Sequence, residues 1–246
     1  MKKWVLLVST FCSLAIAFCT NAQQIDDSAL YQDAVKNLIR LYTSRQGENI
    51  HIYNGPEHIQ IYPGIAGTPF FNPNEKEKDP FQIGTVYYDG VLYPDVRIAY
   101  DIVKDELIVK NHQNVSIELN KQRVGYFSLY GHTFIALASD KSATDIGFLE
   151  VVYDDATMTI YESRTKQPVR MLLPTDHYEF KEQDNFIVKK GNTTFPVTSR
   201  NSFIALFGDQ QEEIKRFIRK NKFNFKSDIE SAILKTTRYY KQLKNG

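Results

Sequence analysis

Apolar residues repeat along the chain with two different periods, and the change of period separates helical ends from a β-rich middle. Near the start, apolar pairs recur every three to four residues, which predicts an amphipathic helix. The pairs are Leu30/Tyr31, Ala34/Val35, Leu38/Ile39 and Leu41/Tyr42. Asp26 and Asp27 precede this segment and Gly47 follows it, as the helix dipole and helix capping favour.

From Asn49 to Val197 the period is two, which is typical of half-buried strands. For example, Val96, Ile98, Tyr100 and Ile102 alternate with Arg97, Ala99 and Asp101. Turn signals follow at short intervals: Asp89-Gly90 fits a two-residue hairpin, and Asp154-Asp155 and Gly191-Asn192 are others. About twelve strands without crossover helices predict an α+β, mainly β fold. The expected architecture is an antiparallel meander, either a curved open sheet or a barrel.

The C-terminal part returns to the helical period. Asp209 with Glu212, and Ser227 with Glu230, have the spacing of a capping box and mark two helix starts. One side of the second helix is formed by Ile229, Ile233, Thr237, Tyr240 and Leu243, and the opposite side carries Lys235, Arg238 and Lys241. We expect these amphipathic helices to pack on the sheet.

The segment from Pro63 to Gln82 has neither period. It contains four prolines, two glycines and a charged stretch from Glu75 to Asp79. Connections of this length in compact domains are usually binding loops, lids or disordered segments. Because the rings of Phe70, Phe71 and Phe81 need burial against something, we interpret the segment as a candidate interaction loop.

Residues 1–22 have the three zones of a secretory signal peptide. Lys2 and Lys3 are followed by an apolar stretch from Val5 to Phe18, and cleavage is expected after Ala22. An alternative, acylation of Cys19, would place Phe18 where lipoprotein sites prefer a small side chain. The remainder, residues 23–246, is expected to form one exported domain that is periplasmic or secreted and not transmembrane.

Cleavage would remove both cysteines, Cys12 and Cys19, together with the only tryptophan. A mature chain without thiols excludes disulfides, thiolate zinc sites, iron–sulfur clusters and a cysteine nucleophile. The sequence predicts no cofactor.

Charge is nearly balanced but unevenly distributed. Without Lys2 and Lys3 the chain has 28 basic and 29 acidic side chains. The segment from Glu212 to Gly246 has ten Lys/Arg and four Asp/Glu, a net charge of +6, and the rest is near −7. The basic C-terminal helix could make a weak contact with an anionic surface, or its charges could be a solvated face docked on the chain's own acidic body. Nucleic acid is not expected as a partner.

Candidate catalytic patterns are weak throughout. The histidines are His51, His58, His112, His132 and His177, and none has metalloprotease spacing. Glu57-His58 and Asp176-His177 place an acid beside an imidazole, but neighbours in a strand point to opposite faces. Asp105-Glu106 and Asp154-Asp155 are explained by turns, and no serine lies in a nucleophile elbow. We therefore predict no catalytic, cofactor-binding or metal-binding residue.

Several segments resemble uncharacterised exported β-rich proteins of the Bacteroidetes type. They are Tyr53-Asn54-Gly55-Pro56-Glu57, the stretch from Gly84 to Tyr93, Tyr100-Asp101 and the tail from Ser202 to Leu243. The resemblance implies an envelope or secreted setting and implies no activity.

Three functional hypotheses follow. The first is a non-catalytic envelope or secreted protein that binds another protein or a surface component. The alternative is a carrier that holds an apolar ligand in a lipocalin-like or lipoprotein-carrier-like curved sheet. The third is a hydrolase built from dispersed Asp, Glu and His residues.

Overall fold

A computed structural model describes residues 34–38, 51–74, 78–139, 142–172 and 177–245. The chain separates into two units, residues 1–42 and 43–246. In the first, residues 34–38 are helical, within the segment predicted as the first helix. The predicted signal peptide and the remainder of that helix lie outside the described residues.

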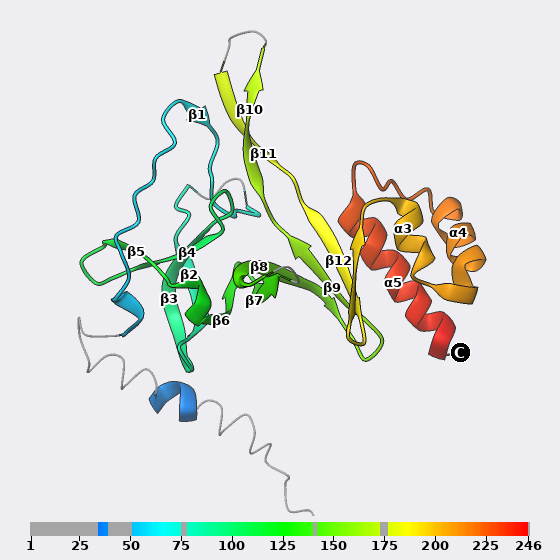
Figure 1. Cartoon of the computed structure of the whole chain (residues 1–246), viewed down its shortest axis with the longest axis horizontal. Coiled ribbons are helices and arrows are strands. Elements are labelled where there is room, and N and C mark those ends of the chain that lie inside the picture. Colours follow the sequence, from blue (N-terminus) through cyan, green and yellow to red (C-terminus); the bar gives the residue numbers. More distant parts are fainter. Residues whose placement is uncertain (1–33, 39–50, 75–77, 140–141, 173–176, 246) are drawn as a thin grey trace, which may run out of the picture. The chain divides into compact units, whose positions relative to one another are not determined.

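The second unit is dominated by a ten-stranded antiparallel sheet with the order β13-β12-β9-β8-β7-β6-β2-β3-β4-β5 (Figure 1). Its strands are β2 (Gln82–Tyr88), β3 (Val91–Asp101), β4 (Glu106–Lys110), β5 (Ser116–Glu118), β6 (Val124–Leu129), β7 (His132–Ser139), β8 (Ser142–Asp154), β9 (Thr159–Ser163), β12 (Asn185–Lys190) and β13 (Thr193–Val197). A smaller sheet contains β1 (Ile65–Ala66), β11 (His177–Glu182) and β10 (Lys166–Met171).

The helices at the C-terminal end are α3 (Arg200–Ala205), α4 (Gln211–Lys220) and α5 (Ile229–Asn245). Short 3-10 helices are η2 (His51–Tyr53), η3 (Lys121–Arg123) and η4 (Gly208–Gln210). Within the described residues, no helix has the length and apolar character needed to cross a membrane.

The predicted antiparallel meander is confirmed in most of the sheet, because strands that follow one another in the chain pair in two runs, β2 to β5 and β6 to β9. Long-range pairing of β2 with β6 joins the two runs. The β10–β11 hairpin departs from the meander, and β1 pairs with β11 in parallel. Of the two predicted forms, the sheet is the open one, with β5 and β13 as its edges.

The three predicted turns connect strands as expected. Asp89 and Gly90 have φ of 52° and 81°, so both adopt the left-handed conformation that a two-residue hairpin requires. Gly191 also has a positive φ, of 58°, between β12 and β13. After β8, the Asp155 carboxylate accepts hydrogen bonds from the backbone N–H groups of Thr157 and Met158, which holds the turn into β9.

Ring contacts between distant strands show that the sheet is strongly curved. The ring centroids of Tyr100 on β3 and Phe148 on β8 are 5.7 Å apart. These strands are four places apart in the sheet, which in a flat sheet would separate them by about 19 Å. The sheet therefore curls, and Phe127 and Phe134 fill its concave side with ring contacts at 4.8–5.3 Å. This filling favours a packed core over a ligand chamber.

Asp105 joins the two sides of the curl. It lies in the β3–β4 turn with a φ of 58°. Its carboxylate accepts hydrogen bonds from the Tyr100 hydroxyl at 2.7 Å and from the backbone N–H of Phe148 at 3.3 Å, and it pairs with Lys121 at 2.8 Å. Turn placement was predicted for Asp105, but its contact with β8 was not.

A second core lies between the C-terminal helices and the strands β9 and β12. Ile160 and Val188 on these strands belong to one buried cluster with Phe203 of α3, Ile218 of α4 and Ile233 of α5. The predicted apolar side of α5 is confirmed by the burial of Ile233, Thr237 and Tyr240, whereas Leu243 is exposed.

Helix starts were predicted less well than helix faces. The Asp209–Glu212 capping box is wrong, because Asp209 lies inside η4 and α4 has Gln210 at its N-cap without a side-chain hydrogen bond. The capping box of this region is instead at Ser199 and Ser202, which start α3.

We expect Phe134→Ala to lower the free energy of unfolding by about 3–5 kcal/mol, because it removes a fully buried ring from the centre of the concave core. Urea denaturation followed by circular dichroism measures this. The control Leu172→Ala, at a side chain that is 70% exposed, should change the value by less than about 0.5 kcal/mol. Equal effects of the two substitutions would contradict the proposed core.

Candidate functional site

The phenylalanines of the candidate interaction loop are buried in the chain's own core. Phe71 packs edge-on against Phe134 at 5.1 Å in the concave core. Phe70 and Phe81 lie on the opposite side of the sheet, where they form a small cluster with Ala99 and Ile108. The segment therefore covers the outside of β3 and β4, and burial leaves none of these three rings as a surface for a partner.

In β3, the predicted alternation of buried and solvated side chains is absent where the segment from Pro63 to Gln82 covers the strand. The alternation predicted Ala99 and Asp101 on a solvated side, but both are fully buried. Asp101 is compensated by hydrogen bonds from the Tyr62 hydroxyl and from the backbone N–H groups of Val103 and Lys104. A strand covered on both faces loses the period-two signal that a half-buried strand shows.

Four of the five histidines contact carboxylates that are not adjacent in the sequence. His51 contacts Asp89, His58 contacts Glu106 and Glu118, His132 contacts Glu150, and His177 contacts Glu179. His112 packs edge-on against Tyr53. Sequence adjacency therefore identified none of these pairs; Asp176 lies outside the described residues.

Among the described residues, a largely buried charge network is centred on Arg164. Its guanidinium contacts carboxylates from four parts of the chain at 2.7–3.4 Å. They belong to Glu150 on β8, Glu162 on β9, Asp184 before β12 and Glu230 on α5. The single guanidinium therefore joins the sheet to α5. Its one positive charge cannot neutralise four carboxylates.

Glu162 and Glu150 are directly opposite each other on β9 and β8. Their pKa values differ because the burial of the two carboxyls is compensated to different extents by nearby cations and hydrogen bonds. Burial, added to the charges of Glu230, Asp184 and Glu150, raises the pKa of Glu162 to about 9 despite its contact with Arg164. Burial also acts on Glu150, but hydrogen bonds from His132 and Arg164 outweigh it and lower that pKa. Both side chains are at most 5% exposed, so we interpret the pair as structural.

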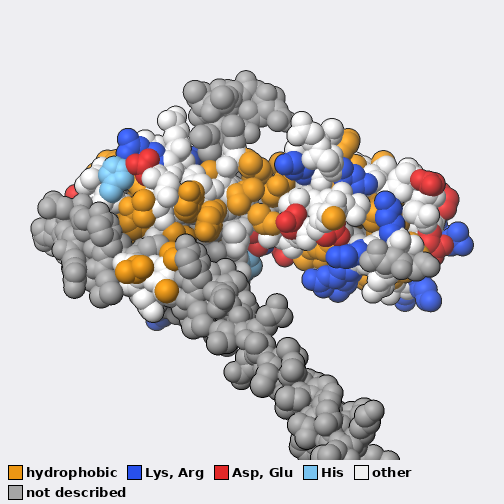
Figure 2. Space-filling view, turned by 90° about the horizontal axis from the view of Figure 1, so that it is seen from below, with side chains coloured by type: hydrophobic (Ala, Val, Ile, Leu, Met, Phe, Trp, Pro, Cys, Tyr) orange, Lys and Arg blue, Asp and Glu red, His pale blue; other side chains and the backbone are white. Residues whose placement is uncertain are grey.

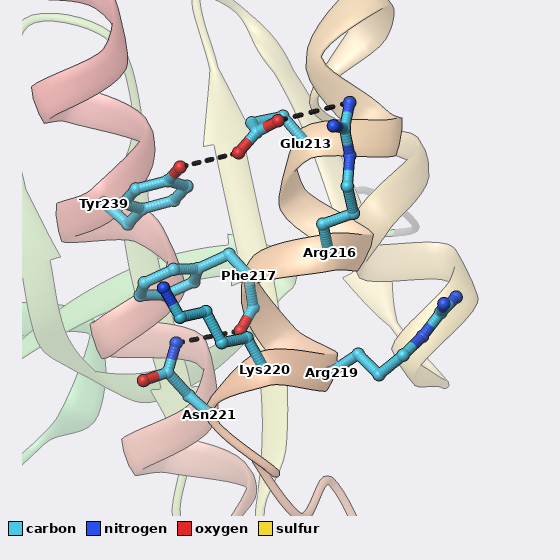
Figure 3. Close-up of a pocket in the computed structure, with 7 residues that line it drawn as sticks. All are labelled: Glu213, Arg216, Phe217, Arg219, Lys220, Asn221 and Tyr239. Atoms are coloured by element: carbon cyan, nitrogen blue, oxygen red, sulfur yellow. Dashed lines mark hydrogen bonds and ion pairs between the residues drawn. The ribbon is translucent and has the colours of Figure 1, made fainter.

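A groove of about 640 Å³ lies between α4 and α5 (Figure 3). Phe217 and Tyr239 stack in parallel at 3.8 Å along it, and the Tyr239 hydroxyl donates a hydrogen bond to Glu213 at 2.9 Å. This bond raises the pKa of Tyr239. The other lining residues include Arg216, Arg219 and Lys220. The groove therefore presents aromatic surface beside an excess of positive charge.

Not all of the C-terminal basic residues face outward as a free charged surface. Lys241 pairs with Asp155 at 3.6 Å, and the ammonium groups of Lys235 and Lys244 lie over the rings of Phe223 and Tyr240. These contacts favour the interpretation that much of the α5 charge is docked on the chain itself. The groove beside α4 gathers three basic side chains, of which Arg216 pairs with Glu213 at 3.3 Å.

The convex side of the curled sheet carries a continuous row of apolar side chains. Cross-strand neighbours connect Leu92, Tyr87, Tyr126, Ile135 and Leu149, on the strands β3, β2, β6, β7 and β8. Ile83 and Leu137 extend the row and are exposed. We call these seven residues the outer apolar face. Figure 2 shows hydrophobic side chains gathered over the strands in the middle of the molecule.

The centre of the outer apolar face is a pair of parallel tyrosine rings. Tyr87 and Tyr126 stack at a centroid distance of 5.4 Å and remain 38% and 36% exposed. Gly125 permits this arrangement, because a Cβ at its position would lie 2.6 Å from Cδ1 of Tyr87. The hydroxyls of Ser128 and Thr133 form a hydrogen-bonded pair beside the rings, which adds a polar margin.

Comparison with known proteins does not identify the chain. No protein-family model matches it, and no curated protein and no solved structure is significantly similar to it.

We expect Glu162→Gln to become more stable relative to the wild type as the pH rises. The pKa of the Glu162 carboxyl is higher in the folded protein than in the unfolded chain. Its contribution to the stability of the fold is therefore fully present below the unfolded pKa and is lost as the pH rises toward 9. The uncharged amide avoids the loss, so the difference in unfolding free energy should grow by at least about 1 kcal/mol between pH 5 and pH 8. Urea denaturation at both pH values measures it.

The control is Glu57→Gln, which makes the same substitution at an exposed glutamate outside the Arg164 network and is measured at the same two pH values. If Glu162→Gln behaved like this control, a raised pKa at Glu162 would be ruled out.

Proposed function

We propose that the protein acts without catalysis, in the cell envelope or outside the cell, by binding a partner protein through the outer apolar face. The observation that supports this is the continuity of the apolar row across five adjacent strands, with two exposed tyrosines at its centre. Contiguous exposed apolar patches of this kind usually mark interaction sites, whereas isolated apolar residues do not.

The chemistry of the face suits a folded protein partner. Tyrosine combines a large apolar ring with a hydroxyl, and it is enriched at the centres of protein interfaces. Thr85, Ser128 and Thr133 lie on the same side of the sheet and provide hydroxyls at its margin. The Arg97–Asp79 ion pair, 2.8 Å long, adds charge next to Ile83. We expect a partner with a complementary apolar patch and a polar rim.

Substitution of Tyr126 by lysine tests this proposal. The charge would enter the centre of the outer apolar face, and we expect at least a tenfold loss of affinity for the partner, since removal of a central interface anchor costs about 2 kcal/mol or more. The protein without residues 1–22 serves as bait for an envelope extract. The partner recovered with the wild type is then measured against each variant by biolayer interferometry.

The matched control is Tyr178→Lys, at a tyrosine of β11 that is 47% exposed and lies in the smaller sheet. This variant should keep wild-type affinity, and both variants should give the wild-type circular dichroism spectrum. Equal binding by Tyr126→Lys and Tyr178→Lys would exclude the outer apolar face.

Contact with an anionic surface is a second candidate, favoured by the groove between α4 and α5. Arg216, Arg219 and Lys220 line it, and an anionic lipid headgroup would complement their charge. We expect Arg219→Glu to reduce sedimentation with phosphatidylglycerol vesicles severalfold, and the binding to weaken between about 50 and 300 mM salt. Lys226→Glu, at an exposed lysine outside the groove lining, should have a smaller effect. Equal loss in both variants would indicate net charge rather than a site.

A further inference from the structure

A histidine and two glutamates converge where the chain covers the edge of β5. Backbone hydrogen bonds fix this position: the N–H of His58 donates to Ser116 at 2.8 Å, and the N–H of Glu118 donates to Pro56 at 2.9 Å. His58 thereby lies beside Glu118 of β5 and Glu106 of β4. The three side chains come from separate stretches of the chain, and the register of the strands holds them together.

The donor atoms are spaced like the ligands of one metal ion. His58 Nδ1 lies 3.0 Å from Glu118 Oε1 and 3.6 Å from Glu106 Oε2. One donor atom from each residue lies within 4.8 Å of the others. In a tetrahedral zinc site with bonds of about 2.1 Å, two ligands are about 3.4 Å apart. The two measured separations lie on either side of this value.

The environment holds two carboxylates and one nearby ammonium group, that of Lys104. The Oε2 atom of Glu106 is buried and has no hydrogen-bond partner among the described residues. The Lys104 ammonium is 3.7 Å from this oxygen, and Lys104 is itself partly exposed. The imidazole of His58 is only 3% exposed and points its Nδ1 between the two carboxylates. A buried carboxylate oxygen without a hydrogen-bond partner, facing a buried imidazole nitrogen, is the arrangement that a divalent cation would complete.

We propose that His58, Glu106 and Glu118 bind one zinc ion. One imidazole nitrogen and two carboxylate oxygens are ligands that zinc accepts, and three protein ligands leave a fourth position for water. The ion would tie the segment around His58 to β4 and β5, and so stabilise the cover over the outside of β3 and β4. This site is independent of the outer apolar face.

Two other histidine–carboxylate contacts are less suited to metal. Glu150 beside His132 already accepts a charged hydrogen bond from Arg164 at 2.7 Å, so a cation is present there. His177 and Glu179 form an exposed pair in which Glu179 also contacts Lys181 at 2.9 Å. The His177–Glu179 pair provides a matched control, because any zinc bound there would be held weakly at the surface by one imidazole and one carboxylate.

Isothermal titration calorimetry of the EDTA-treated protein with zinc chloride tests the site. We expect one ion per chain with a dissociation constant below about 10 µM, accompanied by a rise in melting temperature. Glu118→Gln and His58→Ala should each weaken binding at least about tenfold, and His177→Ala should not. Glu118 is partly exposed, so its glutamine variant tests the ligand role even where His58→Ala folds poorly.

Two results would overturn the proposal. One is wild-type protein that binds no zinc below about 100 µM, which would leave His58, Glu106 and Glu118 as a polar cluster that holds no metal. The other is an unchanged affinity in Glu118→Gln together with a loss in His177→Ala, which would assign the binding to the surface pair.

Discussion

The contact between the rings of Tyr100 and Phe148 is the constraint on which most of the structure depends. It brings β3 against β8 although three strands separate them in the sheet, and it is possible only because the sheet bends through that whole interval. Bending places Phe127 and Phe134 inside and Tyr87 and Tyr126 outside. The inside of the curl is filled by rings, which leaves the outer surfaces of the described residues accessible to other molecules.

The sequence predicts the local elements of this fold well and their long-range pairing poorly. Period-two alternation, the Asp89-Gly90 turn and the apolar side of α5 are properties of neighbouring residues, and all three appear in the structure. The pairing of β2 with β6 joins residues about forty positions apart, and the β10–β11 hairpin leaves the sheet. Neither feature has a local signal. The capping box at Ser199 was missed because serine at its third position is less recognisable than glutamate.

The candidate sites are harder to predict from the sequence than the fold is. A signal for the outer apolar face was present in the run Val86-Tyr87-Tyr88, because consecutive apolar residues in a strand must occupy both faces. As one side of a hairpin, that run carries no information about what covers its second face. The loop phenylalanines correctly indicated a need for burial, but the sequence could not show that β3 and β4 supply it. The neighbours of His58 come from β4 and β5, and adjacency to Glu57 carried no information about them.

Arg164 has a consequence for how the molecule comes apart. Its four carboxylate contacts span β8, β9, the turn before β12 and α5, so detaching the last helix would expose a guanidinium and leave its acids unequally matched. Separate fraying of the C-terminal helix is therefore opposed by electrostatics as well as by apolar packing. The helical end and the adjoining strands should open as a single cooperative unit, and their amide protons should exchange with solvent together.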